Sequence, residues 1–60
     1  MNIPKDPVML MSYINTQLRD NYDNLDDLVK SLGLDEREIT DKLKTCGFTY
    51  NAELNKFTSV

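Results

Sequence analysis

The sequence lacks histidine and tryptophan, and it contains one cysteine, Cys46, and two glycines, Gly33 and Gly47. Without an imidazole, neither a Ser-His-Asp nor a Cys-His catalytic arrangement can be assembled. One cysteine excludes an intrachain disulfide, and a structural zinc site needs four cysteine or histidine ligands. Two isolated glycines cannot form a phosphate-binding loop or a dinucleotide-binding fingerprint. We therefore expect no enzyme activity, no metal site and no cofactor.

The chain is short, with 60 residues, of which 40% are hydrophobic and 28% are charged. This composition is typical of a folded chain, and we expect a single small domain over residues 1–60. A core of this size gives a marginal fold, so self-association would add useful stability.

The charge and the N-terminal segment narrow the range of partners and locations. The net charge is −3, which disfavours nucleic acid because phosphate backbones repel an acidic domain on average. The N-terminal segment is too short and too polar for a signal peptide or a membrane helix. A single free thiol fits a reducing compartment. We therefore expect a cytoplasmic protein with no membrane contact.

Caps and hydrophobic spacing indicate three helices. Asp6 before Pro7 is typical of a helix start, because proline lacks the N–H that would be unsatisfied there. Asn24 and Asp35 are further N-cap candidates, and Gly33 is typical of a helix end in the left-handed conformation. Apolar residues recur at helical spacing after each cap. These signals predict helices over about residues 7–20, 25–32 and 36–46.

The last part of the chain alternates aromatic and polar residues, which is typical of strands. Phe48 and Tyr50 flank Thr49, and Phe57 follows a polar turn, so we predict a hairpin over about residues 48–59. A lone hairpin is marginally stable in water, so its aromatic side chains must pack on the helices.

Helical spacing also leads to two expectations about individual side chains. Cys46 follows Ile39 and Leu43 on one face of the third helix, so we expect a buried, inert thiol. Asn15 and Arg19 form an i,i+4 polar pair on the first helix. We expect this pair to brace the acidic residues of the next segment, namely Asp23, Asp26 or Asp27.

The second and third helices, joined by a tight glycine turn, have the layout of a helix-turn-helix. With the hairpin behind them they are similar to a miniature winged helix, whose recognition helix would present Arg37, Thr40 and Lys44 to DNA. Asp41 lies inside that stripe, and residues 35–45 carry three basic against four acidic side chains, a net charge of −1. Since DNA binding neutralises several phosphates, this function ranks second.

A second apolar stripe on the first helix suggests a surface for a protein partner. Met9 and Tyr13 form this second stripe, and Met11 lies beside the main one. Three small helices need not cover Met9, Met11 and Tyr13, which would then form an adaptable partner surface. The alternative is that all of these side chains belong to the core, because a small domain wastes little apolar area.

The most specific pattern of the chain lies in its first third. It reads Lys5, Asp6, Pro7, Leu10, Ser12, Asn15, Thr16, Leu18, Arg19, Asp20 and Tyr22, and it is followed by LDDLVKSLGLD and KLKTCGFTYNAELNKF. Over about residues 2–57 the chain resembles a small bacterial family described as a domain of unknown function, number 4250. That family consists of short stand-alone proteins without an assigned activity. The resemblance implies a bacterial cytoplasmic setting and no catalytic residue, cofactor or ligand.

Together these observations predict a mainly α fold: three short helices in a winged-helix-like arrangement, followed by a small β-hairpin. The leading functional hypothesis is a non-enzymatic protein-interaction module that binds a protein partner or itself, through the first helix or the hairpin edge. The alternative is a small winged-helix-like DNA-binding protein.

Overall fold

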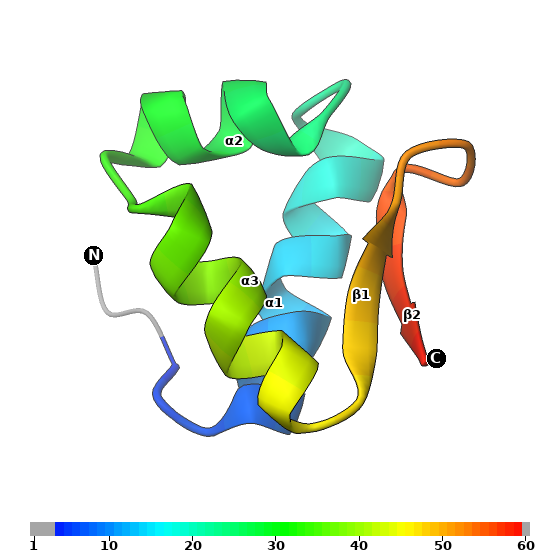
Figure 1. Ribbon diagram of the computed structural model, residues 1–60. Coiled ribbons are helices and arrows are strands. Elements are labelled where there is room, and N and C mark those ends of the chain that lie inside the picture. Colours follow the sequence, from blue (N-terminus) through cyan, green and yellow to red (C-terminus); the bar gives the residue numbers. More distant parts are fainter. Residues whose placement is uncertain (1–3, 60) are drawn as a thin grey trace.

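The computed structural model describes residues 4–59 as a mainly α fold with a small hairpin, which confirms the predicted fold class. The helices and strands follow one another without any crossover in the sheet (Figure 1). In chain order they are α1 (Pro7–Asp20), α2 (Leu25–Leu32), α3 (Glu36–Thr45), β1 (Phe48–Asn51) and β2 (Lys56–Ser59).

Each helix begins at the residue that the sequence indicated. The Asp6 carboxylate accepts the amide N–H of Met9 at 3.1 Å, and the Asn24 side chain accepts that of Asp27 at 2.8 Å. Asp35 caps α3 by accepting the amide N–H groups of the residues two and three positions later. These bonds satisfy N–H groups that have no partner within the helix, which is why the three starts could be predicted.

α2 lies across one end of the α1–α3 pair (Figure 1). The hairpin lies on one side of α1, and the C-terminal end of α2 lies on the other side. One apolar cluster joins the helices to β2. Its buried members are Leu10, Ile14, Leu18, Leu25, Leu28, Val29, Ile39, Leu43 and Phe57. Half-buried aromatic side chains of β1 pack against this cluster, as the sequence predicted for a hairpin that cannot stand alone.

The end of α3 corrects one expectation. α3 ends at Thr45, and Cys46 is its C-cap, with φ −98° and ψ 9°. Gly47 then takes the left-handed conformation, with φ 86°, and turns the chain into β1. Because Cys46 lies outside the helix, its thiol does not continue the buried face of Ile39 and Leu43, and it is exposed. The prediction of a buried thiol is therefore wrong.

No helix within residues 4–59 combines the length and the hydropathy that crossing a membrane would need.

Candidate functional site

A groove of about 650 Å³ lies between α1 and the hairpin, hereafter the α1–hairpin groove. Its lining includes Met11, Asn15, Thr16, Arg19, Leu54 and Lys56. The residues of α1 therefore form one wall, and the hairpin turn with the start of β2 forms the other. We take this groove as the candidate binding site.

One asparagine fixes the hairpin wall against α1. The Oδ1 atom of Asn15 accepts the amide N–H of Phe57 at 2.7 Å, and its Nδ2 donates to the carbonyl oxygen of Phe57 at 3.0 Å. The side-chain amide thus pairs with the outer edge of β2 as a neighbouring strand would. This contact sets the separation between the two walls of the α1–hairpin groove.

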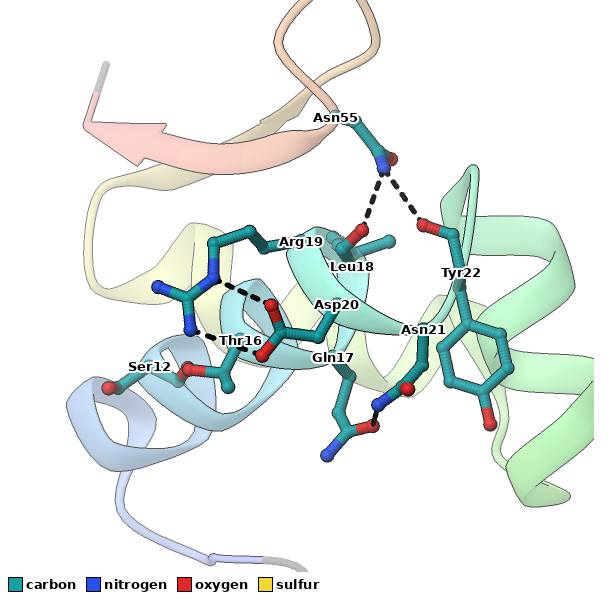
Figure 2. Close-up of polar contacts among 9 residues, drawn as sticks. All are labelled: Ser12, Thr16, Gln17, Leu18, Arg19, Asp20, Asn21, Tyr22 and Asn55. Carbon is teal, nitrogen blue, oxygen red and sulfur yellow. Dashed lines mark hydrogen bonds and ion pairs between the residues drawn. The ribbon is translucent and has the colours of Figure 1, made fainter.

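A second asparagine fixes the turn at the end of the groove. Asn55 has a positive φ of 53°, which asparagine tolerates better than most residues. Figure 2 shows its Nδ2 donating to the carbonyl oxygens of Leu18 and Tyr22, both at 3.1 Å. Its Oδ1 accepts the hydroxyl of Tyr50 at 2.7 Å. Asn55 therefore satisfies carbonyl groups at the end of α1 while it holds the hairpin turn in place.

The same tyrosine connects the hairpin to α2. The amide N–H of Leu25 donates to the hydroxyl oxygen of Tyr50 at 3.3 Å, and that hydroxyl in turn donates to Asn55. Tyr50 also packs against Phe57 across the hairpin, with ring centroids 5.5 Å apart. The turn, α1 and α2 are consequently held by one connected set of polar contacts.

The electrostatics of the groove come from two cations. Arg19 forms a two-pronged contact with Asp20, in which Nε and Nη2 lie 2.9 and 3.1 Å from the carboxylate oxygens (Figure 2). Hydrogen bonding to Arg19 lowers the pKa of Asp20, and the same bond raises the pKa of Arg19. Lys56 takes part in none of the ion pairs formed within residues 4–59. Among the described residues, none that lines the groove is acidic, although the chain as a whole is acidic.

The groove has the chemistry of a binding surface. The Thr16 hydroxyl donates to the carbonyl oxygen of Ser12 at 2.9 Å, so it is engaged with its own helix (Figure 2). No cluster of three or more histidine, cysteine, aspartate or glutamate side chains within residues 4–59 could hold a metal ion. The lining offers apolar contact, cations and amides, which together suit a peptide with apolar and acidic side chains.

The structure separates the side chains that were predicted to form a partner surface on α1. Met9 is 61% exposed, whereas Met11 and Tyr13 are half-buried and pack against the core. Met9 and Met11 are two residues apart, which puts them about 200° apart around a helix. Met11 lines the α1–hairpin groove, and Met9 does not. The three residues therefore do not form one surface.

The structure places the predicted DNA-facing stripe on the outer side of α3. Arg37 is 91% exposed and faces Asp41, with Nε and the carboxylate 3.9 Å apart. The Thr40 hydroxyl donates to the carbonyl oxygen of Arg37 at 3.1 Å, and Lys44 is exposed. The stripe exists as a surface, but its arginine is partly neutralised by the acidic residue beside it.

The expected bracing of the acidic segment by Asn15 and Arg19 is wrong. Asn15 is engaged with Phe57, and Arg19 is paired with its chain neighbour Asp20. Sequence reasoning also missed Leu54 and Lys56 as wall residues. A leucine inside a polar turn was the one sequence signal that could have pointed to Leu54.

Comparison with known proteins gives a family and no relative of known activity. A family model described as a domain of unknown function (DUF4250) matches residues 4–57. No curated protein and no solved structure matches the chain.

Proposed function

Because the chain belongs to the family described as a domain of unknown function (DUF4250), we propose a function from the structure: a non-enzymatic protein-interaction module. Its docking site is the α1–hairpin groove, and its ligand is a peptide segment of another protein that carries apolar and acidic side chains. The observation that carries this proposal is the lining of the groove, which combines Met11 and Leu54 with Arg19 and Lys56 and, within residues 4–59, includes no acidic side chain.

Charge supports the choice of ligand. The chain has 10 acidic and 7 basic residues, so a groove whose charged lining residues, Arg19 and Lys56, are both cations runs against the overall balance. Such local complementarity selects an acidic partner and increases its rate of association. Arg19 is shared with Asp20, so Lys56 is the cation that is open to a ligand carboxylate.

Exposed apolar area supports a protein ligand. Leu54 is 58% exposed at the hairpin turn, where a polar residue would be the ordinary choice. The turn does not depend on it, since the Asn51 side chain holds the turn by accepting the amide N–H groups of Glu53 and Leu54. A large side chain that the fold does not need is available to contact a ligand.

The test is an amide NMR titration of the whole protein with the peptide acetyl-Glu-Leu-Asp-Leu-amide. We expect shifts at Met11, Thr16 and Lys56, and none with the matched peptide acetyl-Lys-Leu-Lys-Leu-amide. Lys56→Glu should abolish the shifts, whereas Lys44→Glu, the same charge change on α3, should leave them. Equal shifts with both peptides, or none with either, would contradict the proposal.

Winged-helix-like DNA binding is the second candidate, because α3 follows α2 after a tight turn and presents Arg37, Thr40 and Lys44 outward. It ranks second because Asp41 faces Arg37 and a DNA-binding surface must supply several free cations.

A further inference from the structure

The contact between Asn15 and Phe57 also reveals how the hairpin is oriented. Both main-chain polar groups of Phe57 are bound to Asn15, so they point away from β1. Phe57 is opposite Tyr50, which makes this a non-hydrogen-bonded pair of the antiparallel ladder. Bonded and non-bonded pairs alternate, so Thr49 and Asn51 bond to β2. The N–H and C=O groups of Phe48 and Tyr50 therefore point to the outer edge of β1.

This outer edge is open within the described part of the chain. Within residues 4–59, no group outside the hairpin forms a hydrogen bond with the main-chain N–H or C=O of Phe48 or Tyr50. These groups are therefore available to pair with another strand. The two edges of the hairpin thus differ: Asn15 covers the edge of β2, and the edge of β1 is a template for another strand.

We propose that the occupant of this edge is β1 of a second copy of the chain, paired antiparallel around a two-fold axis at Thr49. Phe48 of one copy would lie opposite Tyr50 of the other, and Thr49 would lie opposite its own equivalent. Each Phe48–Tyr50 pair would exchange two main-chain hydrogen bonds, so every outward group of these residues would gain a partner. The result is a continuous four-stranded sheet with an isologous interface.

Several features of β1 favour a second copy. Its sequence, FTYN, contains no charged residue and no proline. In a symmetric pairing any charge on the strand would meet the same charge in the other copy, and edge strands that avoid pairing commonly carry lysine or proline. Thr49 is exposed, whereas Phe48 and Tyr50 are half-buried against the core, so pairing would place aromatic beside aromatic and threonine beside threonine. Both kinds of cross-strand pair are stabilising.

The proposal is independent of the docking function, because β1 contributes no lining residue to the α1–hairpin groove. Sedimentation equilibrium from micromolar to millimolar concentration tests it directly. We expect the average mass to rise from 6.9 kDa toward twice that value. Thr49→Lys places like charges opposite each other at the axis and should keep the protein monomeric. The matched variant Ser59→Lys, at an exposed position at the end of β2, should still dimerise.

Amide hydrogen exchange of the wild-type protein gives a second readout that needs no variant. The amides of Phe48 and Tyr50 should be protected at high concentration and exchange faster on dilution, while the Thr49 amide stays protected throughout. A monomer at every concentration, a dimer that persists in Thr49→Lys, or loss of the dimer in both lysine variants would overturn the proposal. Binding of the acidic peptide should survive Thr49→Lys, which separates this test from that of the groove.

Discussion

The side chain of Asn15 binds both main-chain polar groups of Phe57, a residue 42 positions later in the chain. This contact ties the first element of the fold to the last. It positions the hairpin wall of the α1–hairpin groove, and it covers the edge of β2. The same two hydrogen bonds therefore shape the proposed docking site and leave β1 as the edge open to a second copy.

Replacing Asn15 should destabilise the protein. Asn15→Leu keeps a side chain of similar size but leaves the N–H and C=O of Phe57 without partners in a part-buried contact. We expect a loss of about 2 kcal/mol in the free energy of unfolding, measured by urea denaturation. Thr16→Ala is the control: its hydroxyl bonds only to its own helix, so its effect should stay within about 0.5 kcal/mol. Equal unfolding free energies of Asn15→Leu and wild type would contradict the structural role of the Asn15–Phe57 hydrogen bonds.

Replacing Asn55 shows whether this residue contributes only its backbone conformation in the turn or also stabilises the fold through its side-chain hydrogen bonds. If its left-handed backbone were its only contribution, Asn55→Gly would be neutral or stabilising, because glycine adopts φ 53° without strain. The side chain, however, bonds to Leu18, Tyr22 and Tyr50. We therefore expect Asn55→Gly to lower the unfolding free energy by about 1–2 kcal/mol in thermal or urea denaturation. A stabilised glycine variant would refute this account.

Local features of the fold could be predicted from the sequence, and contacts between distant segments could not. The caps at Asp6, Asn24 and Asp35 bind amide N–H groups no more than three residues later. The capping side chain and the group that it binds therefore lie in the same short segment of sequence. Asn15 and Asn55 bind groups 33 to 42 residues away, and a single sequence does not say which of many asparagines will make such contacts.

Cys46 shows how sensitive a face assignment is to where a helix ends. Helical spacing from Ile39 and Leu43 would bury the thiol, but α3 ends one residue earlier, at Thr45. In contrast, the division of Met9 from Met11 follows from helix geometry alone, since residues two apart lie on different sides of a helix. That part of the candidate surface could have been excluded from the sequence.

The Arg19–Asp20 pair should be visible in the pH dependence of one carboxyl group. Hydrogen bonding to Arg19 lowers the pKa of Asp20 below its ordinary value of 3.8. Because the folded-state pKa is the lower one, the pair stabilises the fold above that ordinary value, and the contribution is lost as the pH falls through the folded-state pKa. Arg19→Gln should raise the pKa of Asp20 in a carbon-detected NMR titration. Arg37→Gln, which removes an arginine on α3, should leave the titration of Asp20 unchanged; a shift of similar size there would contradict the pairing.

The charges on α3 decide between the two candidate functions. DNA binding neutralises several phosphates, whereas the outward stripe of α3 has Arg37 facing Asp41 and leaves Lys44 as its remaining cation. We therefore expect a mixed-sequence duplex at low salt to leave the amide NMR spectrum of the protein unchanged. Asp41→Asn provides a sharper form of the test, because it frees Arg37 without altering the core. If the wild-type protein shows shifts confined to α3 and the hairpin, and if these grow in Asp41→Asn and vanish in Lys44→Glu or at high salt, the winged-helix reading replaces the peptide-docking proposal.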